Sequence, residues 1–411
     1  MKCSDEAHAA RHAGAAWLAQ ALQASRRDTL ALFEVFEQAL PKLWVPQHDT
    51  LNPPLWELGH IGWFQEFWLA RNPQRGAGTT ADPAADRPAG VRSQGDALYD
   101  SSQVAHATRW ALPLPGTAAT RDDLAGQLSG TLALLRGLAD EACDDDAALY
   151  FFRLALLHED MHHEAALYTA QSLGVAITDP RWQACPLPAV CPQLALDAGP
   201  WQLGSSGPGF AFDNEGGAHT LALPATHIDS RVLRWADYLP FVEAGGYSQA
   251  QWWGEAGGAW MAAERVTAPR YLRRDGKHWQ QWRHGQWCPL DLALPACHLT
   301  LHEAQAWCQW AGRRLPTEAE WERAAVEQPE AFTWGAVWEW TASTFAPYPG
   351  FEPHPYRDYS APWFGSHRVL RGASFMTQPR LRHPRYRNFF TAQRNDVPAG
   401  FRTCSLHAGR A

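Results

Sequence analysis

The feature that most constrains the fold of this chain is a change of sequence pattern near residue 180. Before it, apolar residues recur every three or four positions, as in residues 30–36 and 124–138, and glycine is sparse inside these stretches. This spacing predicts amphipathic helices. After it, short mixed segments alternate with glycine-rich motifs such as GSSGPG and GEAGGAW, which is typical of a loop-rich α+β domain. A chain of 411 residues is also too long for one ordinary core.

We therefore predict an α+β multidomain protein with a helical bundle over residues 1–182, a proline-rich linker over 183–196 and a loop-rich domain over 197–411. Two further helices are expected over residues 55–69, after Pro53 and Pro54, and over 147–173, which makes a four-helix bundle. Residues 72–117 form a long connection of the kind that is usually functional or disordered. In the second domain we expect helices over 301–312 and 317–325, the latter with a capping box of Thr317 and Glu320.

The net charge and the apolar runs limit the choice of partners and compartment. A formal charge of −8 argues against a general nucleic-acid binder and against an anionic-membrane binder. No apolar run reaches the roughly 18–20 residues of a membrane helix, and the N-terminus lacks the apolar core of a signal peptide. The eight cysteines include no CxxC pair and are expected to be reduced. We expect a cytoplasmic monomer or weak homo-oligomer with small-molecule partners, and neither nucleic acid nor membrane among them.

The strongest chemical signal is the segment LHEDMHHE. His158 and His162 are four residues apart inside an apolar helical stretch, which places both imidazoles on one helix face, where they can share a metal ion. His60, within LWELGHIGWF, offers a third imidazole and leaves other coordination positions open. Three neutral imidazoles suit Fe(II), Zn(II) or Cu(II), so the ligand set alone does not choose the metal.

The same segment also matches HExxH, the signature of zinc metalloproteases, with Glu159 as the would-be general base. The match is incomplete, because Ala165 and Tyr168 stand where the extended signature has glycine and histidine. For Glu159, Asp160 and Glu164 two roles stay open on spacing alone. They either orient the imidazoles from behind or are solvated helix carboxylates.

Several motifs taken together resemble one family. They are the His60 segment, the HxxxHxE of residues 158–164, GFAFDNE at 209–215, AWCQWAGRRLPTEAEWE at 306–322, VWEWT at 337–341, RGAS at 371–374 and AGFR at 399–402. They look like the iron-dependent sulfoxide synthases of ergothioneine biosynthesis. The resemblance implies a DinB-like bundle, a C-terminal domain like that of formylglycine-generating enzymes (C-type-lectin-like), and Fe(II) on the three histidines.

The resemblance also implies a reaction. Family members use O2 to join the imidazole betaine hercynine to a thiol, through the ring carbon between the two nitrogens. Formylglycine generation itself is not expected, because residues 375–378 read FMTQ where that enzyme has its cysteine pair. The family's proton donor is a tyrosine, for which Tyr356 and Tyr359 are the candidates. A quaternary ammonium needs an aromatic or polar cradle, and the chain holds 22 tryptophans.

Departures from the family pattern concern the second substrate. In the ergothioneine enzymes, arginines of this long connection hold the carboxylates of γ-glutamylcysteine. Arg109 matches one of them, but the earlier arginine is replaced near residues 105–106. Met161 stands where some members have glutamine. Asn388, Phe389 and Phe390 stand where some members have Asn-Trp-Asp. This less charged, more aromatic set resembles the selenoneine synthase branch, in which a selenosugar is the donor and a carbon–selenium bond forms. Alternatives are a thiol donor (γ-glutamylcysteine or cysteine), a zinc hydrolase and a non-catalytic betaine-binding protein.

Overall fold

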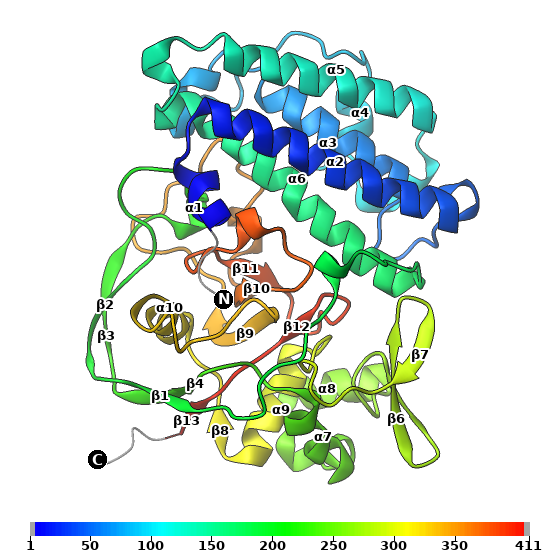
Figure 1. Ribbon diagram of the computed structural model, residues 1–411, viewed down its shortest axis with the longest axis vertical. Helices are drawn as coiled ribbons and strands as arrows, with labels where there is room; N and C mark the ends of the chain where they lie inside the picture. The colour runs from blue at the N-terminus through cyan, green and yellow to red at the C-terminus, as the bar shows by residue number, and fades with distance from the viewer. Residues whose placement is uncertain (1–4, 407–411) are drawn as a thin grey trace.

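A computed structural model describes residues 5–406, which form a helical bundle stacked on a mixed α+β domain (Figure 1). The N-terminal half contains α1 (Asp5–His12), α2 (Ala15–Ala39), α3 (Pro54–Trp68), α4 (Gly95–Tyr99), α5 (Thr117–Arg136) and α6 (Asp146–Leu173). The four long helices α2, α3, α5 and α6 make the expected bundle, and residues 30–36 are the C-terminal part of α2. Pro54 opens α3, while α6 is capped by Asp145 at its start and by Gly174, with φ of 72°, at its end.

The long connection between α3 and α5 is ordered and packs on the bundle. It contains the short 3-10 helices η2 (Arg75–Thr80) and η3 (His106–Ala111) on either side of α4. The indole Nε1 of Trp56 donates to the carbonyl of Leu98 over 2.8 Å, and Arg71 makes a bidentate ion pair with Asp96. These contacts hold α4 against α3.

The C-terminal half contains several small sheets and four helices. One sheet has the order β1-β4-β13-β8, a second has β11-β10-β9-β12, and β2-β3 and β5-β6-β7 form antiparallel ribbons. The strands are β1 (Gln193–Leu196), β2 (Gly199–Leu203), β3 (His219–Leu223), β4 (Thr226–Asp229), β5 (Leu272–Asp275), β6 (His278–Arg283), β7 (Gln286–Pro289), β8 (Arg313–Arg314), β9 (Val337–Thr344), β10 (Arg368–Ala373), β11 (Asn388–Phe390), β12 (Ala399–Gly400) and β13 (Cys404–Ser405). The helices are α7 (Trp235–Glu243), α8 (Glu255–Glu264), α9 (Leu301–Ala311) and α10 (Glu318–Glu327). The capping box of Thr317 and Glu320 is confirmed at the start of α10.

One part of the predicted linker, residues 183–196, is not linker. Its last four residues form β1, which pairs antiparallel with β4 from Gln193 opposite Asp229 to Leu196 opposite Thr226. The prolines at 186, 188 and 192 suggested irregular chain, but the strand begins only after the last of them. Leu196 is buried there, so the strand is held by ladder hydrogen bonds and by core packing.

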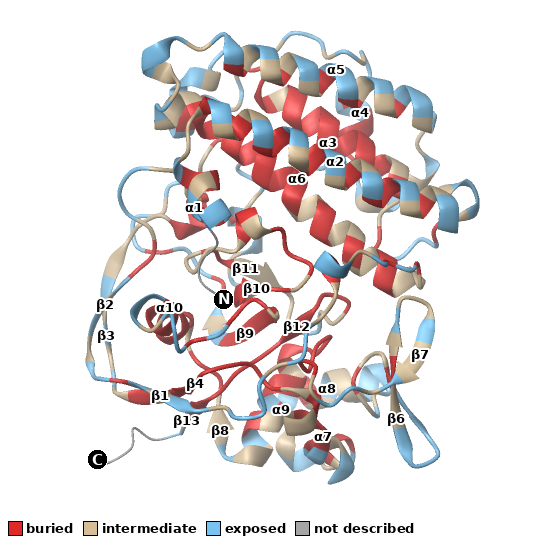
Figure 2. Cartoon of the chain, in the orientation of Figure 1, coloured by how far each residue is buried: buried red, intermediate tan, exposed pale blue. Residues whose placement is uncertain are grey.

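The core is continuous across the two halves. Figure 2 shows burial along α3 and α6 in the bundle and along β9 and β10 below them. One apolar cluster joins Phe64 and Leu157 of the bundle to Phe210 and Trp338 of the C-terminal domain. Among residues 5–406, no helix has both the length and the apolar character needed to cross a membrane.

Candidate metal centre and cavities

Three imidazoles meet where α3 lies against α6. His60 comes from α3, and His158 and His162 come from successive turns of α6. One nitrogen of each ring lies within 4.8 Å of the corresponding nitrogens of the other two. Within residues 5–406 this is the only such group of three or more histidine, cysteine or carboxylate side chains. The structure therefore brings together the three predicted metal ligands.

The ring of His60 is fixed by the backbone of α4. Its Nδ1 lies 2.8 Å from the carbonyl oxygen of Tyr99, so Nδ1–H donates and Nε2 keeps its lone pair. Burial lowers the pKa of His60 to about 3, which keeps the ring neutral. Gly59 permits the approach of α4, because a Cβ there would lie 2.3 Å from the ring of Tyr99.

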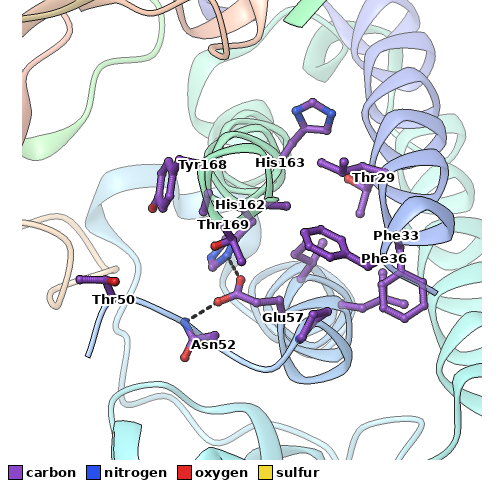
Figure 3. Close-up of a pocket in the computed structure, with 16 residues that line it drawn as sticks. Thr29, Phe33, Phe36, Thr50, Asn52, Glu57, His162, His163, Tyr168 and Thr169 are labelled. Atoms are coloured by element: carbon purple, nitrogen blue, oxygen red, sulfur yellow. Dashed lines mark hydrogen bonds and ion pairs between the residues drawn. The ribbon is translucent and has the colours of Figure 1, made fainter. Parts of the chain in front are cut away.

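The ring of His162 is fixed by a carboxylate that the sequence analysis did not single out. Its Nδ1 lies 2.5 Å from Oε2 of Glu57, whose Oε1 accepts from Nδ2 of Asn52 over 2.5 Å (Figure 3). Burial alone would raise the pKa of Glu57, but the neighbouring His162 outweighs it and lowers that pKa to about 2. Glu57 lies one turn before His60 on α3, and that i, i+3 spacing within an apolar helix was the available signal.

The ring of His158 is held by packing. Phe64 stacks on it with the ring centroids 3.5 Å apart, and within the described chain its Nδ1 has no hydrogen-bond partner. Burial lowers the pKa of His158 well below the ordinary value. Its Nε2 lies 3.2 Å from Nε2 of His162. Imidazole nitrogens that converge in this way, with the lowered pKa of His60 and of His158 keeping those two rings neutral, fit a divalent cation of the first transition series.

The carboxylates on α6 are buried and bond elsewhere, so neither role considered from their spacing describes them. Glu159 makes a bidentate pair with Arg26 of α2, at 2.8 and 3.1 Å. Asp160 is paired with Arg380, and Glu164 accepts three hydrogen bonds from the C-terminal domain. Because Glu159 is held by an arginine on α2, it does not have the freedom of the general base that a zinc hydrolase would need.

A cavity of about 240 Å³ lies beside His162, between α6 and the C-terminal domain. Four predicted substrate-binding residues line it together with one candidate tyrosine: Met161, Asn388, Phe389, Phe390 and Tyr359. The hydroxyl groups of Tyr359 and Tyr386 lie 3.0 Å apart and both approach the sulfur of Met161. Further walls that the sequence analysis did not select are Tyr168, Trp338 and Tyr386. Trp338 and Tyr386 come from segments far from α6 in sequence, so no local spacing signals them. Tyr168 lies on α6 seven residues after Met161, and helix periodicity could have indicated it.

A second cavity, of about 310 Å³, is lined by the other candidate tyrosine. Its lining includes Trp63, Phe64 and Tyr356 together with polar residues of the segments 100–103 and 357–358. The Tyr356 ring centroid lies 6.2 Å from that of His158 and 5.0 Å from that of Phe64. In the described part of the chain, the Tyr356 hydroxyl has no hydrogen-bond partner. Tyr356 thus faces the metal centre from the side of His158, and Tyr359 from the side of Met161.

Arg109 lies outside both of these cavities. Its guanidinium stacks 3.9 Å from the ring centroid of Trp56 and donates to Oδ1 of Asn52 over 2.9 Å. Trp56 in turn stacks on His60 with centroids 4.9 Å apart. The structure therefore places Arg109 behind the metal ligand and not with Met161 and residues 388–390.

A third, smaller cavity lies inside the bundle, on the Nδ1 side of His162. It has a volume of about 70 Å³, and Figure 3 shows Thr29, Phe33, Phe36 and His163 around it. Thr29 Oγ1 and His163 Nδ1 have no hydrogen-bond partner among the described residues. The ring of His163 packs at a tilt against that of Trp182, with centroids 4.8 Å apart, and points away from the three imidazoles although it follows His162 in sequence.

Comparisons with known proteins match both halves of the chain. The model of the DinB superfamily matches residues 21–166, and that of the sulfatase-modifying factor enzyme 1-like domain matches residues 186–336 and 332–405. The formylglycine-generating enzyme of Streptomyces coelicolor is 27% identical and covers 50% of this chain and 86% of its own length.

Two relatives match along almost the whole chain. The hercynine oxygenase of Mycolicibacterium smegmatis is 31% identical and covers 94% of this chain and 97% of its own length. That of Mycolicibacterium thermoresistibile is 32% identical and covers 94% of each. The resemblance inferred from the motifs is thereby confirmed: this protein belongs to the hercynine oxygenases, the ergothioneine-type sulfoxide synthase family built from a DinB-like and a formylglycine-generating-enzyme-like domain.

Proposed function

We propose that the protein is a mononuclear non-haem Fe(II) enzyme that uses O2 to join carbon 2 of the hercynine imidazole to the selenium of a donor such as a selenosugar. The observation that carries the proposal is the three-imidazole centre opening beside an aromatic cavity, in a chain whose relatives are hercynine oxygenases. His60, His158 and His162 would hold the iron. When bound, the iron supplies the redox chemistry and open positions for O2 and for a soft chalcogen ligand.

Hercynine fits the cavity beside His162. Its trimethylammonium group donates no strong hydrogen bond and is best held by aromatic faces. Tyr359, Phe389 and Phe390 supply such faces, and Asn388 at the same wall offers an amide for the substrate's polar end. Placed there, the imidazole of the substrate points toward the three ligands.

The proton for the reduced oxygen would come from Tyr356. Burial raises the pKa of Tyr356, so the phenol keeps its proton at neutral pH. Its hydroxyl is not engaged by another described side chain, whereas that of Tyr359 is already bonded to Tyr386. Tyr359 would then serve as a wall of the hercynine cavity.

The reaction balances when O2 accepts four electrons. The C–H bond of the imidazole and the Se–H bond of the donor break, and a C–Se bond forms. One oxygen atom stays on the selenium and the other leaves as water. The same balance holds for a thiol, with sulfur in place of selenium.

The donor assignment rests on what the second cavity offers. Its lining combines the aromatic rings of α3 with Asp100, Ser101, Ser102 and Gln103, side chains that suit the apolar faces and hydroxyl groups of a sugar. A glutamyl peptide would need cationic partners for its carboxylates. Within residues 5–406, the lining holds one cation, Arg357, which lies in the same cavity as the acidic Asp100 and Asp358. Arg109 is committed to Asn52 and Trp56, so no second arginine is offered, which favours the sugar over the peptide. A thiol donor, as in ergothioneine-type chemistry, is the second candidate.

A donor competition tests the proposal. Anaerobically iron-loaded protein receives hercynine and air together with a selenosugar, γ-glutamylcysteine or cysteine, and mass spectrometry identifies the products. We expect a selenium adduct to form much faster than any sulfur adduct. A sulfoxide from a thiol donor would overturn the selenium assignment and leave an ergothioneine-type enzyme. No adduct from any donor, with iron shown to be bound, would favour a non-catalytic betaine-binding protein.

The tyrosine assignment has a matched pair of variants. Tyr356→Phe removes the proposed proton donor and should lower kcat by about 100-fold, within the usual range for general acids. Tyr359→Phe removes a hydroxyl from the cavity wall and should mainly raise KM for hercynine. The reverse pattern would assign proton donation to Tyr359.

A further inference from the structure

One short segment of the C-terminal domain forms hydrogen bonds with α6, the helix that carries His158 and His162. This clamp segment, residues 374–380, follows β10 directly and includes the start of the 3-10 helix η10 (Pro379–Leu381). It contacts two carboxylates on α6: Asp160, which lies between the ligands His158 and His162, and Glu164, two residues after His162.

The first contact is an ion pair at Asp160. Nε of Arg380 donates to Oδ2 over 2.8 Å and Nη2 donates to Oδ1 over 2.7 Å. Ser25 of α2 adds a third bond to Oδ1 over 2.7 Å. Asp160 is 0% and Arg380 5% exposed. A bidentate pair of this kind fixes orientation as well as distance.

The second contact is a cluster of donors at Glu164. Oε1 accepts from Ser374 Oγ over 2.6 Å and from Thr377 Oγ1 over 2.8 Å. Trp338 Nε1, on β9, donates to the same oxygen over 2.7 Å. All of these side chains are buried, so water cannot easily replace a lost donor.

The clamp segment is continuous with a wall of the hercynine cavity. It joins β10 to the segment that leads into β11, and β10 pairs with β11 through Leu370 opposite Asn388 and Val369 opposite Phe389. Figure 1 shows these two strands directly beneath α6. The chain that leaves β10 therefore holds the ligand-bearing turn of α6, while β11, paired with β10, presents residues 388–390 to the substrate cavity.

We propose that Ser374, Thr377 and Arg380 are positioning residues that set the metal-bearing turn of α6 relative to the substrate cavity. They act through Glu164 and Asp160 and touch neither the metal ligands nor the substrate. Reacting groups must be held to within a fraction of an ångström for full activity, so a small shift of this turn should lower turnover more than binding. The activity part of this inference rests on the proposed function, but the metal geometry does not.

The chain offers a matched control for a test. Arg11 of α1 makes a bidentate, buried pair with Glu215 at 2.6 and 2.9 Å, and so also ties the N-terminal half to the C-terminal domain. Among the described residues its guanidinium bonds to Phe210 and Glu215 and to none of residues 158–164. Arg11→Gln therefore removes an interdomain ion pair of similar burial without releasing the metal-bearing turn.

The experiment compares Thr377→Val, Arg380→Gln and Arg11→Gln in the full chain. Each is loaded with Co(II) for its absorption spectrum and its metal dissociation constant, and with Fe(II) for kcat and KM. We expect the clamp variants to shift the Co(II) bands and to lower kcat by about tenfold or more, with KM for hercynine changed less than about threefold. Arg380→Lys should recover part of kcat because it keeps the charge. Arg11→Gln should lower Tm but leave the spectrum and kcat as in the parent protein.

Unchanged Co(II) bands and unchanged kcat in Thr377→Val, with only a lower Tm, would overturn the proposal and make the clamp a purely structural contact. If Arg380→Gln does not fold, Thr377→Val decides alone, since it replaces one hydroxyl by a methyl group. If the parent protein shows no turnover with hercynine, the proposed function fails. The Co(II) spectra then still decide whether the clamp positions the metal site.

Discussion

The two domains contribute to the candidate site in different ways. The bundle supplies all three imidazoles from two helices, and helix periodicity puts His158 and His162 on one face. The C-terminal domain supplies cavity walls from β9, β11 and the irregular chain near Tyr359, which adjoin only after the sheet has formed. The pairing of two candidate ligands thus follows from local rules, whereas the shape of the cavity beside them follows from tertiary contacts.

This difference means that substitutions in the two domains should change different measurable quantities. Ligand and carboxylate variants in the bundle should change metal affinity. Wall variants in the C-terminal domain should change substrate binding and leave metal affinity unchanged. The clamp segment is the exception that we propose, because it reaches from the second domain to the ligand-bearing turn of the first.

The largest expected effect is the loss of a ligand. His162→Ala removes one of three imidazoles and should weaken metal binding by more than about 100-fold, beyond the range seen for outer partners of ligands. Activity should be lost with it. His163→Ala is the control, because His163 lies on the same helix but packs against Trp182. Metal titration of the two variants distinguishes them, and equal affinities would remove His162 from the ligand set.

A smaller effect on metal affinity is expected for the carboxylate that bonds to His162. Glu57→Gln keeps the shape but loses the charge that orients His162, and metal affinity should fall by about 10–100-fold. Glu66→Gln is the control on the same helix, since Glu66 is also buried but accepts from the backbone of Val91 and from Gln127. Competition with a chelator measures both. Equal affinities in the two variants would mean that Glu57 does not tune the site.

The same division explains how much could be predicted from the sequence. The four bundle helices were predicted from apolar periodicity. The three candidate ligands were predicted from the i, i+4 spacing of His158 and His162 and from the single histidine of a second apolar helix, and the structure brings these imidazoles together. Glu57 was missed because a single carboxylate on an apolar helix has several explanations until its partner is placed. Trp338 and Tyr386 were missed because they meet α6 only in the folded chain, whereas Tyr168 could have been found from its spacing of seven residues after Met161 on that helix. Strand β1 was missed because nearby prolines obscured a four-residue strand.

The cavity wall gives the next prediction. Phe390→Leu keeps an apolar side chain but removes a ring face, and KM for hercynine should rise by about tenfold through the lost cation–π contact. Metal affinity should stay as in the parent protein. Phe351→Leu is the control, because Phe351 packs on Phe364 and does not line the cavity. A change of metal affinity in Phe390→Leu, with KM unaltered, would contradict the separation of roles between the domains.

The last prediction concerns stability and contrasts two carboxylates, one in each domain. Glu57 in the bundle has a partner that lowers its pKa, whereas burial raises the pKa of Asp213 in the C-terminal domain to about 6. Ser360 donates to Oδ1 of Asp213, and among the described residues Oδ2 has no partner. The folded protein therefore holds this proton more tightly than the unfolded chain, whose value is near 3.8. The stability that this provides is complete below about pH 4 and is lost as the pH rises through 6.

Asp213→Asn imitates the protonated form of this carboxyl group. At pH 8 it should raise the free energy of unfolding by up to about 3 kcal/mol relative to the parent protein, because the parent must bury a charge or release it on unfolding. Near pH 4 the two proteins should be nearly equal. Urea unfolding at both pH values measures this difference. If the variant were equally destabilised at both, the hydrogen-bond geometry of Asp213 would matter more than its charge, and the two carboxylates would both stabilise the fold as acceptors.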